Sequence, residues 1–583
     1  MALLNLFQKI WVIDFEFHAL AGSLPLPICL VALELHTGEV LRIWADQLRE
    51  LVSPPFHADK RCLVVTYFGS AEWSCFLELG WPLPHHVLDL YAEFRLVSNG
   101  PPRPSGSGLL GALVAYGLPA MGQPEKDANR ELAVRGGPFD SKERLRLLDY
   151  CEADVRATCA LLRAMESDID LPRALLRGRY TKSVARMERA GVPLDVPMLE
   201  AMRLHWERLK LALIREIDDG FRVYEGTTFK AGLWEQWCVD HNVPWPRLAS
   251  GRLALDRDTF RAMARTHPRV APMKELRSTL SELRLERLSV GQDGRNRCLL
   301  SPFGSTTGRN QPSSAKFVFG PSAWIRSLIK PSPGCAVAYV DWSQQEFGIA
   351  AALSRDRNMK EAYRSSDPYL SFACMAGAAP PDATKKSHKL VREKFKVCAL
   401  GVLFGMGVEL MARRIDAGEA DARYLLREHK RVFPGFWRWR EAVLDTSDLE
   451  RGLTTAFGWS LRVTDTTRRT SISNFPMQAN GAEMLRLACI RATEEGVKVC
   501  APVHDALLIE APVDEIDAAV ARTKSAMRWA STEVLSGFAL EAEAEQVVRY
   551  PARYVDDRGR RVWQIIRELL FRWGALPPEE ACS

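Results

Sequence analysis

Long hydrophobic runs are missing from this 583-residue sequence: none reaches the roughly 18 residues that a membrane-spanning helix requires. The amino terminus is interrupted by Lys9, Asp14 and Glu16, which argues against a secretory signal peptide. The 13 cysteines include no C-x2-C pair and no His/Cys cluster with zinc spacing, so a zinc-bound fold is not indicated. These absences predict a cytoplasmic protein with reduced, mostly buried thiols and no membrane contact.

The sequence also lacks a strong excess of either positive or negative charge. The formal net charge is only +6, which permits nucleic-acid binding but does not require it. The sequence shows no internal repeat and no long low-complexity tract, so a repeat architecture is not indicated. Hydrophobic residues (47%) and charged residues (26%) are present at levels ordinary for a globular protein. At roughly 150 residues per domain, the length suggests three or four folded units.

What is present begins with one carboxylate at the end of an apolar run. Residues 336–340 (AVAYV) predict a strand buried on both faces, and Asp341 follows directly. A polar segment containing Gln345 and Glu346 leads into an Ala-rich helical run. Because open sheets place chemistry at strand ends, Asp341 is a candidate metal ligand. Standing alone, it would more simply be the N-cap of the following helix.

A second carboxylate occupies a similar position near the C-terminal end. Two apolar runs within residues 497–510 flank His504 and Asp505, which predicts a β-hairpin with the acidic residue at its tight turn. An aspartate in a turn is ordinarily explained by turn chemistry alone.

Between these carboxylates, a predicted helix carries Arg392, Lys396, Leu400 and Phe404 at steps of four residues. Such steps place the side chains on one slowly curling face, with two cations at one end and apolar groups at the other. That face suits a triphosphate beside a sugar and a base. An amphipathic helix with a solvated basic edge is the alternative.

In this order, the segments DWSQQEFG (341–348), R-x3-K-x3-L-x3-F-G (392–405) and VHDA (503–506) resemble motifs of the A-family DNA polymerases. The resemblance implies a multidomain chain of α/β and α+β class, with a right-hand polymerase domain over residues 171–583. Its thumb would span about 196–295, its palm about 296–356 and 447–583, and its fingers about 357–446. The implied activity is template-directed addition of dNTPs to a primer 3′ end by two-metal phosphoryl transfer.

The same resemblance implies roles for individual residues. Two Mg²⁺ ions would be held by Asp341, Asp505 and the backbone carbonyl of Trp342, with Lys396 as a further catalytic residue. The residues expected to bind the dNTP are Arg392, Lys396, Leu400, Phe404, Gln345 and Glu346. The residues expected to contact DNA are Arg309 (in a T-G-R motif), Asn474, Gln478 and His504. Four features depart from the family pattern: Leu400, Ala506, Tyr369, and the pair Arg468 and Arg469, whose spacing before Asn474 is shifted by a residue.

The N-terminal segment WVIDFEF (11–17) reads as a strand with Asp14 and Glu16 on one face. Two adjacent acids repel unless a cation lies between them. A later helical run, Leu148–Leu162, sets Tyr150 four residues before Asp154. In order, these patterns resemble the DnaQ-like 3′–5′ exonucleases, which implies an RNase H-like domain over residues 1–170. There Asp14, Glu16 and Asp154 would hold two divalent ions and Tyr150 would orient water; a degenerate domain kept as scaffold is the alternative.

A further acid is expected at the exonuclease site, since the family normally adds one after a strand. The run Cys62–Phe68 predicts a strand, and Ser70 would be the N-cap of the next helix, with Glu72 in the first turn. The rival is Asp89, which would otherwise cap the Leu90–Arg95 helix. We favour Glu72 as the catalytic acid.

Another helical pattern, Met273–Leu288, carries Lys274, Arg277 and Arg284 beside its apolar stripe, as a thumb that grips the duplex backbone would need. A solvated helix would look the same.

The expected partners are primer–template DNA and dNTPs. The protein is expected to act as a monomer, and replication accessory proteins are further candidate partners. The layout, with no 5′-nuclease segment before the exonuclease, is similar to that of phage and mobile-element members of the family. This similarity implies that the protein acts in the cytoplasm of a bacterial or phage-infected cell. Two other hypotheses stay open: a net 3′–5′ exonuclease whose polymerase half mainly holds DNA, and a non-catalytic module that occupies primer ends.

Overall fold

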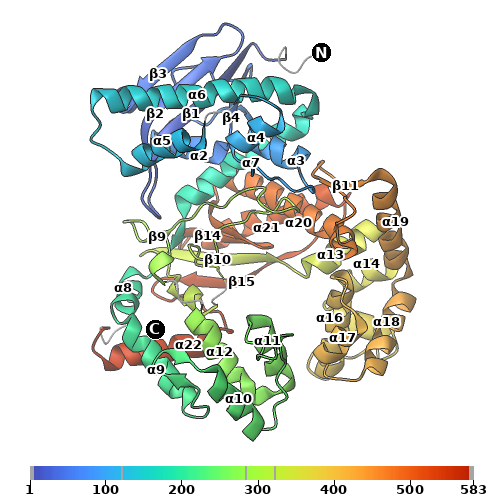
Figure 1. The fold of residues 1–583 in the computed structure, drawn as a ribbon. Coiled ribbons are helices and arrows are strands. Elements are labelled where there is room, and N and C mark those ends of the chain that lie inside the picture. The colour runs from blue at the N-terminus through green and yellow to red at the C-terminus, as the bar shows by residue number, and fades with distance from the viewer. Residues whose placement is uncertain (1–5, 120–121, 282–284, 321–322, 577–583) are drawn as a thin grey trace.

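The computed structural model describes residues 6–119, 122–281, 285–320 and 323–576. An N-terminal unit lies above a second, central sheet, and two helical groups extend from that sheet on opposite sides (Figure 1). Among the described helices, none is long and apolar enough to cross a membrane.

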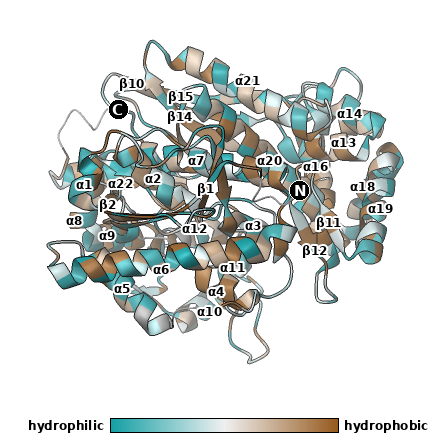
Figure 2. Ribbon diagram, turned by 90° about the horizontal axis from the view of Figure 1, so that it is seen from above, coloured by the Kyte–Doolittle hydropathy of each residue, from teal (hydrophilic) through white to brown (hydrophobic). Residues whose placement is uncertain are grey.

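A five-stranded sheet of order β3-β2-β1-β4-β5 forms the centre of the N-terminal unit, with β1 antiparallel to β2 and parallel to β4. Its strands are β1 (Lys9–His18), β2 (Leu26–Glu34), β3 (Val40–Trp44), β4 (Cys62–Thr66) and β5 (His86–Asp89). Its helices are α1 (Ala45–Glu50), α2 (Gly69–Glu78), α3 (Leu90–Val97), α4 (Leu109–Ala115), α5 (Gln123–Arg135) and α6 (Ser141–Met165). Apolar side chains fill both faces of the sheet, and β1 and β2 are coloured hydrophobic in Figure 2.

The alternation along β1 fixes the face on which its two acids lie. Ile10 and Val12 belong to the core between the sheet and α6, whereas Trp11, Ile13 and Phe15 belong to the core on the other face. By the two-residue period of a strand, Asp14 and Glu16 share the α6 face. The predicted strand is therefore confirmed, with both acids on one side.

Helix α7 (Leu171–Ala190) joins this unit to the rest of the chain. It packs against α2 and β5 on one side and against α20 (Arg469–Glu494) and β13 (Lys498–Val503) on the other. A Cβ at Gly178 would lie only 2.1 Å from the carbonyl oxygen of Val87, so only glycine permits this approach of α7 to β5. Through α7, the two sheets share one helical support.

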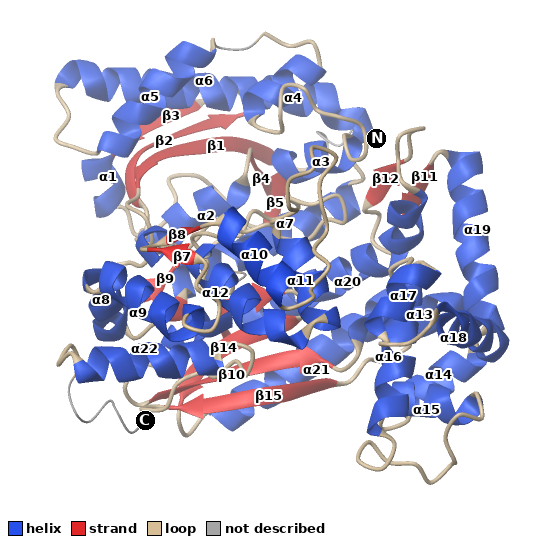
Figure 3. Cartoon of the chain, turned by 60° about the horizontal axis from the view of Figure 1, so that its bottom comes forward, coloured by secondary structure: helices blue, strands red, loops and turns tan. Residues whose placement is uncertain are grey.

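The central sheet is antiparallel, with the order β13-β14-β10-β15. Its other strands are β10 (Cys335–Trp342), β14 (Ala506–Pro512) and β15 (Ala542–Arg549). Helices α20 and α21 (Ile516–Val534) pack on it, as the strands and α21 in Figure 3 show. Both sequence predictions are confirmed here: β10 ends at the Asp341 position, and β13 and β14 form a hairpin around His504 and Asp505.

One helical group lies between β10 and α20 in the chain. Its elements are α13 (Gln345–Ser354), α14 (Arg357–Arg364), α15 (Pro368–Met375), α16 (Lys389–Leu403), α17 (Val408–Arg414), α18 (Glu419–Val432), α19 (Pro434–Glu450), β11 (Gly452–Thr454) and β12 (Ser460–Arg462). The predicted helix that carries Arg392 and Lys396 is α16 and is confirmed.

The other helical group precedes β10. Its elements are β6 (Val192–Pro193), α8 (Val196–Leu204), α9 (Trp206–Asp218), β7 (Tyr224–Glu225), β8 (Thr228–Phe229), α10 (Ala231–Asp240), α11 (Arg257–Thr266), α12 (Ala271–Ser281) and β9 (Arg295–Asn296). The C-terminal helix α22 (Arg560–Arg572) packs on α9 and shares its hydrophobic core.

Two local predictions differ from the structure. Ser70 is not an N-cap: α2 begins at Gly69, because Phe68 adopts a left-handed conformation (φ 76°) and is the N-cap itself. The amides of Phe68 and Gly69 both donate to the carboxylate of Asp89. Asp89 therefore caps the N-terminal end of α2, the role that Ser70 was expected to have. The predicted helix Met273–Leu288 begins at Ala271, and a separate 3-10 turn spans Leu285–Arg287; Arg284 lies outside the described residues.

Candidate active sites

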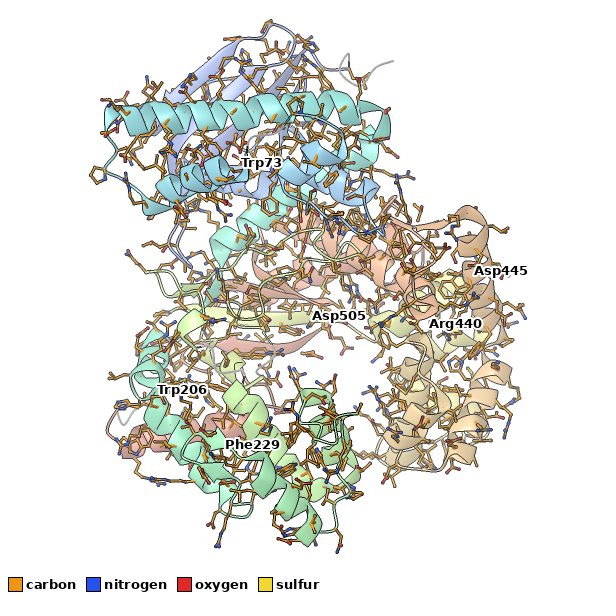
Figure 4. All side chains as sticks on the ribbon, in the orientation of Figure 1. Trp73, Trp206, Phe229, Arg440, Asp445 and Asp505 are labelled. Atoms are coloured by element: carbon orange, nitrogen blue, oxygen red, sulfur yellow. The ribbon has the colours of Figure 1, made fainter. Side chains whose placement is uncertain are left out.

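The carboxylates of Asp341 and Asp505 meet at one end of the central sheet. Asp341 is opposite Ala506 in the β10–β14 register, which places the β13–β14 turn beside the end of β10. The amide of Trp342 donates to the backbone carbonyl of Asp505 at 3.4 Å, which joins the two segments. Figure 4 labels Asp505 in the middle of the molecule, between the two helical groups. Two residues that are far apart in the sequence therefore form one acidic pair.

Burial and neighbouring negative charges raise the pKa values of both aspartates. Burial, with the charges of Asp505 and Glu545, raises the pKa of Asp341 to about 8. Burial and the charge of Glu346 raise the pKa of Asp505 to about 6. The Oδ1 atom of Asp341 is buried and has no hydrogen-bond partner among the described residues. The arrangement has an unsatisfied oxygen and excess negative charge, as a cation site would.

Glu545 on β15 is a site residue that the sequence reasoning missed. Strand β15 pairs with β10, and Glu543 is opposite Asp341 in that register. Because residues paired across two strands lie on the same face, Glu543 is on the side of Asp341; the register shifts at Glu545, and the charge of Glu545 acts on Asp341. The sequence signal was available as two acids two residues apart in an apolar strand pattern.

Polar side chains from three elements line the approach to the acidic pair. Arg309 is half-buried. Its partial burial lowers its pKa, and the nearby charges of Glu346 and Asp505 oppose this shift. Gly481 of α20 makes room here: a Cβ there would lie 3.3 Å from Gln345 Oε1 and 3.7 Å from Arg309 Nη2. These residues, predicted from motifs in separate segments, are brought together.

The remaining predicted DNA contacts lie on α20 and at the hairpin. Asn474 and Gln478 are one turn apart on α20. The Asn474 Oδ1 and Gln345 Nε2 atoms are buried without a hydrogen-bond partner among the described residues. His504 adopts a left-handed conformation (φ 56°), and burial lowers its pKa, so it is neutral near pH 7. Each of these two buried atoms could be satisfied by a polar ligand.

On α16 the predicted cationic end is only partly free. Arg392 is 7% exposed and forms ion pairs with Asp367 and Glu393, so a phosphate would have to compete with these acids. Lys396 forms no ion pair within the described ranges, and its Nζ lies 5.9 Å from the ring centroid of Tyr369. At the other end of the helix, Phe404 is 42% exposed, which leaves an aromatic surface for a base.

The acids of the N-terminal unit gather between β1 and α6. Burial, with the charge of Asp154, raises the pKa of Asp14 to about 8. Burial and the charge of Asp14 raise the pKa of Glu16 well above its usual range. Tyr150 lies beside Asp154, and burial raises the pKa of its hydroxyl, so that it stays protonated. The four residues predicted from two separate motifs are therefore neighbours.

Glu72 and Asp89 have different surroundings. Glu72 is 4% exposed, accepts a hydrogen bond from the amide of Phe15 at 2.8 Å, and lies near the charges of Asp14 and Glu16. Asp89 accepts from four backbone amides, those of Phe68, Gly69, Tyr91 and Ala92. Because these amides use its oxygens, Asp89 acts as a helix cap, and the geometry favours Glu72 as the further acid.

A cation that the sequence reasoning did not anticipate lies at this acidic cluster. The Nζ atom of Lys126, on α5, is 3.2 Å from Asp154 Oδ2 and 6.0 Å from the ring centroid of Tyr150. Its charge opposes the rise in the pKa values of Asp14 and Glu16. A lone lysine in an exposed-looking helix gives no sequence signal for such a contact.

Across the described ranges, no group of three or more His, Cys, Asp or Glu side chains is arranged to hold a metal ion. The unsatisfied Oδ1 of Asp341 and the mutual repulsion of the two aspartates nevertheless fit a divalent cation held by two carboxylates and a backbone carbonyl. At the N-terminal cluster the acids also fit, but Lys126 already offsets part of their charge.

Comparison with known proteins gives a family match for one part of the chain. Residues 306–545 match the model of DNA polymerase family A. A DNA polymerase I, thermostable, of Thermus filiformis is 26% identical over 451 residues, which cover 71% of this chain and 52% of that protein. A DNA polymerase of Mycobacterium phage L5 is 26% identical over 252 residues, or 42% of this chain and 40% of that one. The chain spans about half the length of the Thermus relatives.

A solved structure shares the fold over nearly the whole chain. It is the POL domain of Pol1 from M. smegmatis, in complex with DNA primer-template and dNTP. The TM-score is 0.69 at 18% identity, and the match covers 93% of this chain and 95% of that one. The similarity includes the N-terminal unit as well as the central sheet and helical groups.

Proposed function

We propose that this chain, of which residues 306–545 match the model of DNA polymerase family A, extends a primer 3′ end by template-directed addition of dNTPs. The observation that carries the proposal is the partly buried pair Asp341 and Asp505, with one buried and unsatisfied carboxylate oxygen. The alternative of a non-catalytic module on primer ends predicts that these acids are replaced or neutralised by fixed partners. The retained, unneutralised pair favours catalysis.

In this proposal, divalent metal ions, Mg²⁺ by the family precedent, supply charge neutralisation and activation of the primer 3′-hydroxyl. Asp341, Asp505 and the carbonyl of Trp342 hold them at the end of β10. Glu545, on the neighbouring strand β15, adds negative charge near Asp341. Ala506 on β14 stands in place of the Glu that follows this Asp in the family pattern.

The protein's own side chains position the nucleotide and the DNA. Lys396 is free to neutralise the triphosphate, and Arg392 does so only by exchanging Asp367 for a phosphate. Glu346, beside Asp505, crowds the 2′ position of the sugar, and Phe404 offers its exposed ring to the templating base. Arg309, Asn474, Gln478 and His504 contact the primer–template. The helical groups serve as thumb and fingers around the palm sheet.

We propose a second activity, 3′–5′ degradation, at the N-terminal cluster. The observation that favours it is the convergence of Asp14, Glu16 and Asp154 with Glu72 and Tyr150 in one buried place. These carboxylates would hold divalent ions, and Tyr150, which stays protonated, donates a hydrogen bond that orients water. In this proposal, Lys126 must release Asp154 before the full carboxylate set is available.

Primer extension tests the polymerase proposal. A labelled primer annealed to a longer template is incubated with the protein, Mg²⁺ and four dNTPs, and then with each dNTP alone. The expected result is extension to the template end with all four, and addition only of the template-matched nucleotide with one. Shortening of the primer without any extension would favour the net exonuclease instead.

A further inference from the structure

The loop that presents Arg309 to the acidic pair has an unfavourable backbone conformation. Residues 301–309 contain no helix or strand. Ser301 (φ 49°) and Phe303 (φ 57°) both adopt left-handed conformations, which non-glycine residues rarely take. Such conformations persist only where the surroundings hold them in place. The contacts that hold this loop therefore control where Arg309 points.

Two of those contacts come from the N-terminal unit. Arg95, on α3, donates from Nε to the carbonyl of Phe303 at 2.9 Å and from Nη2 to the carbonyl of Gly304 at 2.6 Å. Asn99, just after α3, donates from Nδ2 to the carbonyl of Thr306 at 2.8 Å. Arg95 is 5% exposed and Asn99 is 1% exposed, so both contacts are shielded from water. Removing the Arg95 guanidinium would take this donor from the carbonyl of Phe303, at a buried position, whereas the carbonyl of Thr306 keeps a second donor when Asn99 is removed.

The opposite side of the loop is held by the polymerase half. Trp459 donates from its indole nitrogen to the carbonyl of Thr306 at 2.9 Å, and its ring stacks on Phe303. Arg486, on α20, donates from Nη1 to the carbonyl of Gly308 at 2.7 Å. The loop is thus clamped between α3 and α20.

The segment that carries Asn99, just after α3, is itself hydrogen-bonded to strand β12. The carbonyl of Asn99 accepts from the amide of Arg462 at 3.0 Å, and Asn99 Nδ2 also donates to the carbonyl of Ser460 at 2.7 Å. A Cβ at Gly100 would lie 2.1 Å from the carbonyl oxygen of Arg462, so the two segments are in the closest backbone contact that glycine allows. The position of α3 relative to the loop is therefore fixed.

We propose that Arg95 and Asn99 are positioning residues for DNA synthesis: they hold the 301–309 loop so that Arg309 reaches the primer terminus beside Asp505. The N-terminal unit is then part of the polymerase site as well as a candidate exonuclease. This inference rests on the proposed polymerase function, because its readout is primer extension. Arg95 acts through its planar fork, which reaches two successive carbonyls; the single ammonium group of a lysine does not reproduce that geometry.

The test compares Arg95→Met, Arg95→Lys and Asn99→Leu with the wild-type chain in steady-state and single-turnover extension of one primer–template. Arg95→Met keeps an unbranched apolar side chain and removes the donors to Phe303, Gly304 and Ser107. Arg42→Met is the matched control, since Arg42 is partly exposed and its ion pairs among the described residues are with Asp149 and Glu152, within the N-terminal unit. Thermal midpoints identify any variant that fails to fold. If Arg95→Met does not fold, the comparison with the wild type is made with Arg95→Lys, which is the mildest change.

Arg95→Met is expected to raise the KM for primer–template about tenfold, the effect of roughly one charge-assisted hydrogen bond, with the single-turnover rate at saturating DNA changed less than about twofold. Arg95→Lys should recover only part of this loss, and Asn99→Leu should resemble Arg95→Met. The control should leave the KM unchanged.

A double-mutant cycle separates positioning from general destabilisation. If Arg95 acts through Arg309, Arg95→Met should add less than about twofold to the KM of Arg309→Ala. Multiplicative effects, or a KM for Arg95→Met equal to that of the Arg42→Met control, would overturn the positioning role alone. Absence of extension by the wild-type chain would overturn the proposed function itself.

Discussion

At the scale of single residues, Glu72 is the proposed catalytic acid, whereas Asp89 caps helix ends through four backbone amides. Glu72→Gln removes a charge beside Asp14 and Glu16, and we expect metal-dependent degradation of a single-stranded 3′ end to slow at least tenfold, which corresponds to about 1.4 kcal/mol. Asp89→Asn should instead lower the thermal midpoint, because an amide accepts fewer of the four donated hydrogen bonds. Initial degradation rates and melting curves of both variants are the measurements; the opposite ranking would move the catalytic acid to Asp89.

The raised pKa of Asp14 makes a prediction about stability in the absence of metal. Its folded-state pKa of about 8 lies above the ordinary 3.8, so the folded state holds a proton that the unfolded state loses. The resulting destabilisation is absent below about pH 4, grows as pH rises, and is complete above about pH 8. In EDTA, Asp14→Asn should therefore melt at a higher temperature than the wild type, with a larger difference at pH 9 than at pH 5.

The matched control for this experiment is Asp149→Asn, on the exposed side of α6, which pairs with Arg42. Its difference from the wild type should not grow with pH in this way. A pH-independent difference for Asp14→Asn would contradict the burial of a shared acidic cluster.

Glu346 is the residue for which we propose a role in sugar selection. Because its carboxylate lies beside Asp505 and Tyr369, Glu346→Ala opens space at the sugar and should raise ribonucleotide incorporation relative to deoxyribonucleotide incorporation at least tenfold, or about 1.4 kcal/mol. The measurement is the ratio of kcat/KM for dNTP and rNTP on one template. An unchanged ratio would mean that another residue excludes the 2′-hydroxyl.

At the scale of elements, helix α7 supports both sheets, and Gly178 marks its closest contact. Gly178→Ala places a methyl group 2.1 Å from the Val87 carbonyl and should destabilise the chain by about 1–3 kcal/mol, since neither backbone can easily retreat. We expect a lower thermal midpoint and a parallel loss of extension and degradation at elevated temperature.

Gly232→Ala in α10 is the control, because a Cβ at Gly232 meets no atom within 4 Å. It should leave both activities unchanged and stabilise the chain by at most about 1 kcal/mol. Equal melting of the two variants would show that α7 does not press on β5.

Elements with a local signal were predicted well from the sequence. The strand before Asp341, the hairpin around Asp505 and the helix with Arg392 depend on hydrophobic period and turn chemistry, which are local properties. What failed depended on neighbours distant in sequence. Arg277, which was expected on a basic flank of its helix, instead lies with its guanidinium 4.1 Å and 4.6 Å from the ring centroids of Phe229 and Phe260.

The same reason explains the site residues that were missed or misread. Lys126 reaches Asp154 from another helix, and Glu545 reaches Asp341 across a strand pair. Arg392 carries the expected charge but is already paired with Asp367. No motif records such pairings, because each depends on how separate elements pack.

At the scale of the whole molecule, the chain places two acidic sites in separate units. Asp505 lies at the end of the central sheet, whereas Trp73, next to Glu72 on α2, lies in the upper unit (Figure 4). Because no residue belongs to both sites, the two activities should be separable by mutation, even though the loop clamp and α7 join the units mechanically.

The most direct test of this account follows one labelled primer–template with wild type, Asp505→Ala, and Asp14→Ala combined with Glu16→Ala, each with and without dNTPs. Asp505→Ala should lose extension, by at least about a hundredfold as expected for a metal-ligating acid, and still shorten the primer. The double variant should extend the primer and not shorten it. Substantial extension by Asp505→Ala, or shortening by the double variant, would contradict the assignment of the two sites.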